Sequence, residues 1–398
     1  MPSRRQVLIS GAAGMLVGLA PGLSAAALPG EARLVVVLLR GGMDGLHAVP
    51  PVGDPAYARA RGAMALEREM VLPLDNTYAF HPALAPLLPY WRKGELAVVH
   101  AVASPYRARS HFDGQDLLES GGARPHQKND GWLNRALTAL SAGRNTGLAV
   151  ANGLPLILQG AAPASSWAPS PLPGLPPELI AKVKRLYAAD LQLAAAFEEG
   201  VQASAMAEEA MSDPADSMTA EPPRKGRDFR TMAQAAGRLL AAPEGPRVAV
   251  LELGGWDTHV GQGLATGRMA ETLGKLAAGL DALAQALGPA WRNTIVVTLT
   301  EFGRTVAANG TNGTDHGTAS LSLLLGGKVA GGRVLTDWPG LSPAALHEGR
   351  DLKPTTDVRA VLKGVLADHL GASKAALDSA VFPDSGAVAA MRGMVRGV

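Results

Sequence analysis

Apolar runs of strand length alternate with amphipathic segments along most of the chain. The runs are rich in valine, leucine and isoleucine and occupy residues 34–39, 96–102, 148–150, 154–158, 247–253, 295–298 and 321–325. Helical spacing of apolar residues predicts a helix that begins near residue 110 and others at 132–141, 178–199, 264–287 and 355–370. Nearly continuous apolar strands that alternate with helices are typical of a buried parallel sheet. We therefore predict an α/β fold with a mainly parallel central sheet flanked by helices on both faces.

Residues 1–27 do not follow this pattern. They contain Arg4 and Arg5 in a twin-arginine motif, then a short apolar segment with several glycines, and small residues at Ala25 and Ala27. This order is typical of a twin-arginine signal peptide, whereas the glycines disfavour a buried helix. No later apolar run approaches membrane-spanning length. We therefore expect export by the twin-arginine translocase to the periplasm or beyond, without stable membrane insertion.

The remaining residues, 28–398, are predicted to form a single domain that carries one polar insertion. The insertion lies around residues 200–228, and it contains Pro214, Pro222 and Pro223. Its composition is compatible with a mobile lid or with disorder.

Composition limits the chemistry and the partners of the chain. Zero cysteines exclude disulfides, thiolate zinc sites, cysteine-held iron–sulfur clusters and a cysteine nucleophile. Any metal must therefore be held mainly by oxygen and imidazole ligands. Without Arg4 and Arg5 the chain has as many basic as acidic residues, and it shows no basic cluster. We expect no nucleic-acid partner, since nucleic acid calls for a basic surface.

Polar residues follow several of the predicted strands. Asp44, the segment 104–111, the pair Asp257 and His259, and Glu301 each lie just beyond the end of a strand. In open α/β sheets this edge is where ligands bind. Taken singly, Asp44 has an alternative role in a turn, and Asp257 as a helix cap. Together, these residues predict a metal site of oxygen and nitrogen ligands.

The segment 295–320 carries the densest group of such residues. A buried strand ends near Glu301 and Arg304, and a loop of glycine, asparagine and threonine then leads to the adjacent Asp315 and His316. Such a loop cannot build core, so an acid and an imidazole at its end indicate a functional site. The alternative is an ion pair between Glu301 and Arg304, with Asp315 in a turn.

Five motifs behind the twin-arginine signal resemble one known family. They read LLRGGMDGL, RSHFDGQDLLESG, GWDTH, TEFGRT and TDHGTAS. In this combination they resemble the exported bacterial family catalogued as domain of unknown function 1501, over nearly all of the chain after the signal. That family is similar, more distantly, to the alkaline phosphatase and sulfatase superfamily. The resemblance implies an alkaline-phosphatase-like fold with a divalent metal, zinc first and manganese, magnesium or calcium as alternatives.

The superfamily's order of site residues can be followed in this chain. The metal ligands that it implies are Asp44, Asp257, His259, Asp315 and His316, with Glu301 as a substitute ligand. Ser110 stands at the position of the hydroxyl nucleophile. Arg109 and Arg304 are expected to hold the oxygens of the transferred group, while His111 and Asp113 are expected to orient ligands.

The chain also departs from the superfamily. Only Thr258 separates Asp257 from His259, and the final histidine has no clear counterpart, His347 and His369 being candidates. The absence of cysteine argues against a type I sulfatase.

Two functions follow from this pattern. The first is an exported metal-dependent hydrolase of phosphate or sulfate esters, acting on a small anionic ester or a glycan. The second is a non-catalytic exported protein that keeps the fold, with or without a structural ion, and binds a glycan, a partner protein or a secretion component. Substitution of Asp315 or His316 separates them, since a hydrolase loses turnover while a structural ion site loses thermal stability first.

Overall fold

The computed structural model describes residues 31–140, 147–168, 176–191, 193–194, 197–198, 201 and 228–397. The predicted signal peptide, residues 1–27, and nearly all of the polar insertion, residues 200–228, lie outside these ranges. Among the helices that are described, none combines the length and the apolar composition needed to cross a membrane.

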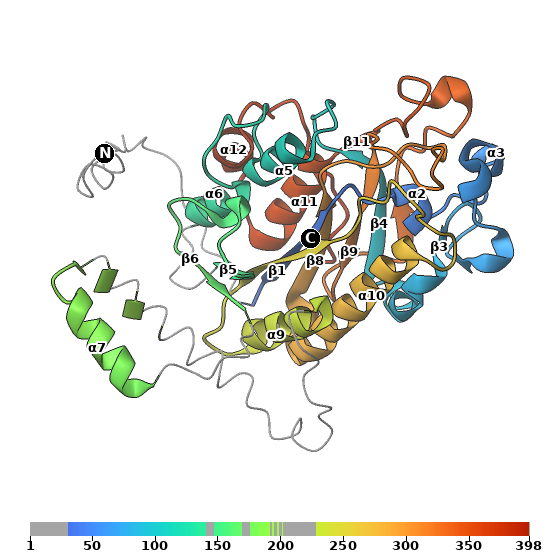
Figure 1. Cartoon of the computed structure of the whole chain (residues 1–398). Coiled ribbons are helices and arrows are strands. Elements are labelled where there is room, and N and C mark those ends of the chain that lie inside the picture. The colour runs from blue at the N-terminus through green and yellow to red at the C-terminus, as the bar shows by residue number, and fades with distance from the viewer. Residues whose placement is uncertain are drawn as a thin grey trace, which may run out of the picture.

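A nine-stranded sheet forms the centre of the described part of the chain (Figure 1). Its strands, in spatial order, are β10 (Arg333–Leu335), β4 (Leu96–Ala103), β9 (Ser320–Leu325), β8 (Thr294–Thr300), β1 (Arg33–Arg40), β7 (Val248–Gly254), β5 (Gly147–Val150) and β6 (Ala164–Trp167), with β11 (Thr356–Asp357) also paired to β4. Every pairing is parallel except those of β9 with β4 and β8. The predicted mainly parallel sheet is confirmed.

Strand β1 shows why the central strands are apolar on both sides. Its odd-numbered residues from Val35 to Leu39 pack into one core, and its even-numbered residues from Leu34 to Leu38 pack into a second core. Side chains alternate between the two faces of a strand, so a strand covered on both faces must be apolar throughout.

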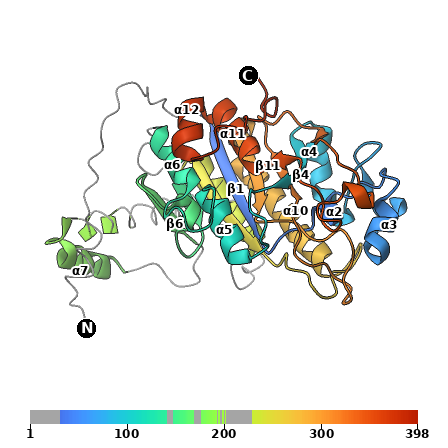
Figure 2. The same ribbon diagram turned by 90° about the horizontal axis from the view of Figure 1, so that it is seen from above.

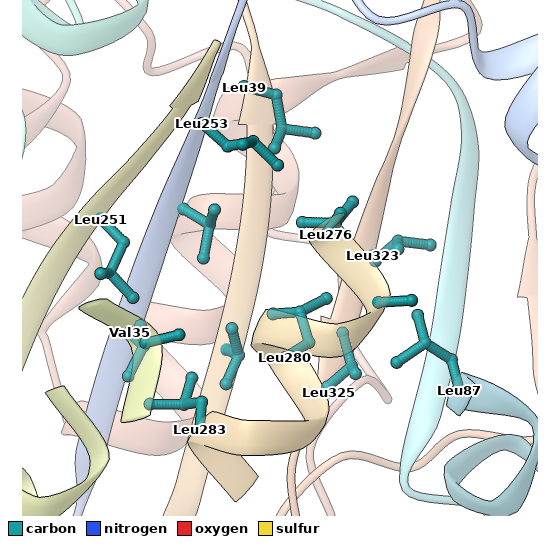
Figure 3. Close-up of a cluster of buried hydrophobic side chains, with 14 of the residues drawn as sticks. Val35, Leu39, Leu87, Leu251, Leu253, Leu276, Leu280, Leu283, Leu323 and Leu325 are labelled. Atoms are coloured by element: carbon teal, nitrogen blue, oxygen red, sulfur yellow. The ribbon is translucent and has the colours of Figure 1, made fainter. Parts of the chain in front are cut away.

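Helices α9 (Phe229–Ala241) and α10 (Arg268–Leu287) cover one face, with the 3-10 helix η3 (Pro82–Leu87) and α4 (Leu88–Arg92) beside them. Leu276, Leu280 and Leu283 of α10 face the sheet, where Leu39 and Leu323 lie among the opposing side chains (Figure 3). These positions recur with helical spacing, and burying each leucine contributes about 1.5–3 kcal/mol relative to leaving it exposed.

The other face is covered by α5 (His111–Ser120), α6 (Trp132–Ala139), α11 (Val358–Leu370) and the π-helical turn η8 (Leu377–Val381), with α12 (Lys374–Ala376) beside η8. Figures 1 and 2 show α11 on the side of the sheet opposite to α10. Trp132 is buried against Phe382, with ring centroids 5.4 Å apart, and its indole nitrogen donates to the Leu118 carbonyl. The predicted flanking helices on both faces are therefore confirmed.

Short elements complete the fold. They are α2 (Gly45–Ala48), α3 (Tyr57–Arg61), α7 (Pro177–Tyr187), the hairpin of β2 (Leu72–Pro73) and β3 (Ala79–Phe80), and the 3-10 helices η1 (Gly62–Met64), η2 (Arg68–Met70), η4 (Leu156–Leu158), η6 (Gly288–Asn293) and η7 (Pro343–Ala345).

The strand predicted over residues 154–158 is wrong. The chain there forms η4, in which the Leu158 nitrogen donates to the Pro155 carbonyl in a 3-10 turn. The strand at this edge of the sheet is instead β6, which pairs with β5 and was not predicted. Its residues Ser165 and Ser166 are polar, so the sequence shows no apolar run at this strand. An edge strand can be polar because it buries less apolar surface than a central one.

Candidate metal centre

The predicted site residues come from segments that meet at one edge of the sheet. Strands β1, β4, β7 and β8 run in the same direction, so their carboxyl ends share this edge. Strand β9 runs in the opposite direction and therefore begins there. The segments 41–44, 104–111, 255–259 and 301–305 leave the sheet at this edge, and the segment 315–319 enters it.

A tight hairpin holds His316 beside Arg304. The Gly303 nitrogen donates to the Thr318 carbonyl at 3.0 Å, and the Gly317 nitrogen donates to the Gly303 carbonyl at 2.8 Å. A Cβ at position 317 would lie 2.4 Å from the Arg304 carbonyl carbon, and a Cβ at 303 would lie 1.9 Å from a backbone oxygen. Only glycine permits this approach, so both glycines are needed to place His316.

Three side chains at this edge form a group able to hold a metal ion. His111, Asp257 and His316 each offer a ligand atom, and these atoms lie within 4.8 Å of one another. The His316 Nε2 atom is 3.3 Å from Asp257 Oδ1, and His111 Nε2 is 3.5 Å from Asp257 Oδ2. His259 adds a fourth donor, since its Nε2 atom is 3.0 Å from Asp257 Oδ1 and 2.9 Å from His316 Nε2.

The opposite ring nitrogen of each histidine contacts an oxygen atom. The pairs are His111 Nδ1 with Glu301 Oε1 at 2.8 Å, His259 Nδ1 with Asp315 Oδ1 at 2.9 Å, and His316 Nδ1 with the Arg109 carbonyl at 2.9 Å. A carboxylate or carbonyl oxygen accepts hydrogen bonds, so these contacts favour the tautomer protonated at Nδ1. The Nε2 atom of each histidine is then left free to bind a metal, as in metal-binding histidines. Those of His111 and His316 belong to one group with Asp257, and that of His259 lies against His316 and Asp257.

The distances within the group fit a cation. The Nε2 atoms of His259 and His316 are 2.9 Å apart. Their lone pairs repel each other unless a proton or a metal ion lies between the two atoms. The buried Nε2 atom of His111 has no hydrogen-bond partner in the described part of the chain, which favours the metal. Zinc–ligand bonds of about 2.0–2.1 Å place the ligand atoms of a tetrahedral site roughly 3.3 Å apart. The distance of 2.9 Å between the Nε2 atoms of His259 and His316, and the distances of 3.0–3.5 Å from each histidine to Asp257, are close to this value.

Arg304 fixes the carboxylate of Asp257. Its Nη1 atom donates to Asp257 Oδ1 at 2.6 Å, and its other nitrogens donate to the carbonyl and hydroxyl of Thr314. Burial opposes ionisation of Asp257, but the hydrogen bond and positive charge of Arg304 hold the pKa of Asp257 below its ordinary value. The guanidinium is fully buried, so its observed role is to position Asp257.

Glu301 and Asp315 are placed behind the histidines. Glu301 is buried and accepts hydrogen bonds from the Gly41 nitrogen and Gln115, as well as contacting His111. Asp315 is half exposed and accepts from Asn309. The sequence predicted both carboxylates as ligands. In the structure each contacts the Nδ1 atom of a histidine, which is where groups that orient a metal-binding histidine lie.

Asp44 lies outside the group. Its carboxylate is buried and accepts from Arg61 at 2.6 Å, from Gln262 at 2.8 Å and from the His47 nitrogen at 3.1 Å. It caps α2 and neutralises Arg61, which leaves its oxygens fully engaged. Arg61 and Gln262 carry no signal in the sequence that would have found them.

Arg109 also differs from its predicted place. Its guanidinium donates to Asp351 at 2.8 and 3.0 Å and to Glu348 at 2.5 Å, while its backbone carbonyl contacts His316. The residue has φ +61°, a conformation that turns its side chain and carbonyl toward these different partners.

Ser110 and His111 begin α5 beside the group. Ser110 occupies the N-cap position, yet its side chain makes no capping hydrogen bond. Its backbone nitrogen donates to the Tyr106 hydroxyl at 3.1 Å. His111 was expected only to orient a ligand, whereas the structure gives it a donor atom in the group. Its place just after a strand, in the motif RSHFDG, was the available signal.

The fold and this edge define an α/β protein of the mainly parallel class, with a centre of histidines and an aspartate at the carboxyl ends of its strands. The chain belongs to the family described as "Protein of unknown function (DUF1501)", which matches residues 91–381. The family expected from the motifs is confirmed. No curated protein matches the chain.

Several solved structures match the chain with low sequence identity and low TM-scores. The zinc complex of the C-terminal periplasmic domain of EptC from Escherichia coli has 10% identity and a TM-score of 0.36, over 77% of this chain and 75% of that one. Phosphonate monoester hydrolase of Agrobacterium radiobacter has 10% identity and a TM-score of 0.37, over 86% and 74%. A 2-O GAG sulfatase has 12% identity and a TM-score of 0.28, over 74% and 64%. At this similarity, the chemistry must be argued from the chain's own residues.

Proposed function

We propose that this chain is an exported metal-dependent hydrolase of phosphate or sulfate esters. The observation that carries the proposal is the grouping of the Nε2 atoms of His111 and His316 with the Asp257 carboxylate. The Nε2 atom of His259 lies against His316 and Asp257, and an oxygen atom contacts the Nδ1 atom of each histidine. The ligands are His111, Asp257, His259 and His316. Imidazole and carboxylate donors suit zinc, whereas calcium and magnesium prefer all-oxygen sites.

The exposure of the ligands favours catalysis over a purely structural ion. The side chain of Asp257 is 43% exposed and that of His259 is 40% exposed. Structural zinc sites are closed, while catalytic sites keep a position open to water and substrate. A non-catalytic binding protein with a structural ion remains the alternative, and it predicts loss of stability when a ligand is removed.

The bound ion would supply charge neutralisation on the phosphoryl or sulfuryl oxygens and would lower the pKa of a nearby hydroxyl. Other residues of the chain hold the proposed ligands in position. Arg304 holds the Asp257 carboxylate, Glu301 holds the His111 ring, and Asp315 holds the His259 ring.

Ser110 is the proposed nucleophile. Its hydroxyl is not used to cap α5, and it precedes the ligand His111 at the start of a ten-residue helix, whose positive end favours an anion. The serine oxygen forms a bond to phosphorus or sulfur, the bond to the ester oxygen breaks, and the serine proton is transferred to the leaving alcohol. Water then adds to the same atom, the bond to the serine oxygen breaks, and the serine regains a proton as phosphate or sulfate is released.

A metal analysis combined with an ester assay tests this proposal. The protein is purified without chelator, its metal content is measured, and hydrolysis of para-nitrophenyl phosphate and sulfate is followed. Asp257→Ala and His316→Ala should lose both metal and turnover, and Ser110→Ala should keep the metal while losing turnover. Asp281→Ala is the control, because this carboxylate accepts hydrogen bonds from Tyr90 and Gln285 and contributes no atom to the metal-binding group.

The outcomes separate the two functions. A protein that binds no zinc, manganese, magnesium or calcium is not the proposed hydrolase. A protein that binds metal without hydrolysing either ester, and that loses thermal stability in His316→Ala, is the binding protein with a structural ion. Turnover that survives in Ser110→Ala assigns the attack to water and leaves the hydrolase proposal intact.

The proposal also places the reaction outside the cytoplasm. Its basis is the twin-arginine motif in residues 1–27. Replacing Arg4 and Arg5 together with lysine should hold the chain in the cytoplasmic fraction, measured by immunoblotting of fractionated cells. Unchanged export of this variant would contradict the proposed route.

A further inference from the structure

A cavity of about 500 Å³ adjoins the metal centre. It lies between α3, the segment 305–309 and the segment 341–350. Its volume is within the range of small-molecule sites, roughly 300–1,000 Å³. The substrate of the proposed hydrolase needs a place for its organic part, and this cavity is a candidate for that role.

Three residues of the cavity wall contact residues of the metal centre directly. Asp315 contacts His259 Nδ1, and Asn309 donates to the His259 carbonyl at 2.9 Å. Arg350 donates to the His316 carbonyl at 2.8 Å. The cavity therefore lies next to the metal centre and is joined to it by these three residues.

Much of the cavity wall is apolar. Val306 and Leu341 are buried, belong to the core beneath the cavity, and line it together with Leu346 and Pro343. Ligand pockets are mostly apolar, with a few polar groups that fix the orientation of the ligand. The organic part that fits here is therefore a ring or an alkyl chain of small size.

Arg59 gives the cavity an unpaired positive charge. It is exposed, lies in the last turn of α3, and no hydrogen bond or ion pair to it is found in the described part of the chain. Arg350 is a second cation in the wall, with Nη1 3.3 Å from Asp351 Oδ1. The carboxylate of Asp315, in the same wall, contacts His259 and Asn309 through its Oδ1 atom. The cavity thus presents a cation to an incoming ligand.

We propose that the substrate is an ester whose organic part is apolar and carries a second anionic substituent, and that this part occupies the cavity with its anion on Arg59. The inference rests on the proposed function for the reacting end of the substrate. A guanidinium binds carboxylate or phosphate oxygens bidentately, which gives selectivity for such a substituent.

Paired substrates test this inference. Phenyl and para-carboxyphenyl esters of phosphate and sulfate differ only by the carboxylate. The wild type should prefer the carboxyphenyl ester through a lower KM, and Arg59→Ala should reduce this preference by roughly tenfold, the effect of losing a charged hydrogen bond. Ala307→Trp, which fills the cavity from an exposed position, should raise KM for both esters. The metal content should not change in either variant.

Arg92→Ala is the matched control. Arg92 is also an exposed arginine in the last turn of a short helix, but α4 precedes the amino end of β4, at the opposite edge of the sheet. This variant should keep the KM ratio of the wild type. If the ratio of the KM values for the two esters is the same in the wild type and in Arg59→Ala, the inference is wrong. Hydrolysis of either ester would still support the proposed function.

A binding measurement separates failure of the function from failure of the inference. The probe is para-carboxyphenylphosphonate, which cannot be hydrolysed as an ester, titrated by calorimetry. If no ester is hydrolysed but the wild type binds this probe about tenfold more tightly than Arg59→Ala, the cavity is an anion site and the hydrolase proposal fails. If the wild type does not bind the probe, or if both proteins bind it equally, the inference fails.

Discussion

Replacing Glu301 with glutamine tests whether a buried carboxylate controls the metal centre through His111. Glu301 Oε1 lies 2.8 Å from His111 Nδ1 and accepts from the Gly41 nitrogen at 2.8 Å and from Gln115 at 3.1 Å. Glutamine keeps the shape, but it is neutral and carries an amide group that donates where the carboxylate only accepts. In the wild type, Glu301 Oε1 contacts all three of these groups. In the variant, this position is taken either by an amide oxygen, which is a weaker acceptor, or by an amide nitrogen, which is a donor.

The charge of Glu301 is part of this effect. Burial opposes its ionisation, but hydrogen bonds, the strongest from His111, hold the pKa of Glu301 below its ordinary value. The residue is therefore a carboxylate at neutral pH. In return, the hydrogen bond to Glu301 raises the pKa of His111. A neutral glutamine makes the His111 ring less basic and less firmly oriented, so it becomes a weaker ligand.

The expected loss of metal affinity is about 10-fold to 100-fold, the usual cost of removing a group that orients a ligand. This corresponds to about 1.4–2.8 kcal/mol of binding free energy. Glu301 is only 1% exposed, so Glu301→Gln should lose close to 100-fold in metal affinity. Asp315→Asn removes the equivalent group from His259, but water reaches this half-exposed carboxylate. Its loss should lie near the lower end.

Competition with a chromogenic chelator at neutral pH measures these affinities, and thermal unfolding of the metal-free proteins shows whether each variant is folded. Asp281→Asn is the control, since its carboxylate accepts from Tyr90 and Gln285 on a distant part of the fold. If Glu301→Gln folds normally and binds zinc as tightly as the wild type, then Glu301 does not orient a metal ligand, and His111 must be removed from the proposed set.

Three further outcomes are expected. Arg61→Ala leaves the buried Asp44 carboxylate without its ion-pair partner, and should lower the free energy of unfolding in urea by about 3–5 kcal/mol. Gly317→Ala places a Cβ 2.4 Å from the Arg304 carbonyl carbon, so the hairpin must shift and zinc affinity in the chelator assay should fall by roughly tenfold or more. Burial lowers the pKa of His100 from 6.5 to about 4. Below pH 6.5 the unfolded state therefore binds more protons, and stability should fall by up to about 3 kcal/mol as the pH drops toward 4. Urea midpoints at several pH values should show a shallower decline in His100→Gln.

The sequence predicts the central strands well because their environment is simple. Strands β1 and β8 are covered on both faces, so their apolar runs mark them to within a residue or two. Strand β6 was missed because an edge strand tolerates serines. The direction of β9 was also beyond the sequence, since an apolar run has the same composition in either orientation. Its antiparallel direction brings Asp315 and His316 back to the edge where β8 ends.

The site was predictable in residue types but not in roles. Asp44 and Asp257 both follow glycines after a buried strand, so the sequence treats them alike. The fold separates them, because Arg61 reaches Asp44 and Arg304 reaches Asp257. His111 shows the opposite case, in which a residue expected to support the site lies close enough to Asp257 to be a proposed ligand. Such distances depend on tertiary packing, which spacing along the chain does not encode.

A buried path of hydrogen bonds joins Asp44 to Asp257, so Asp44 contributes to the structure of this edge of the sheet although it lies outside the metal-binding group. Gln262 donates to Asp44 and accepts from the Thr314 hydroxyl at 2.7 Å, and Arg304 donates to Thr314 and to Asp257. Buried ion pairs contribute little net stability, because the loss of hydration offsets their attraction. The path does fix the position of Arg304, and through it the carboxylate of Asp257. The path therefore acts on the candidate metal centre, where it holds the half-exposed carboxylate of Asp257 in position.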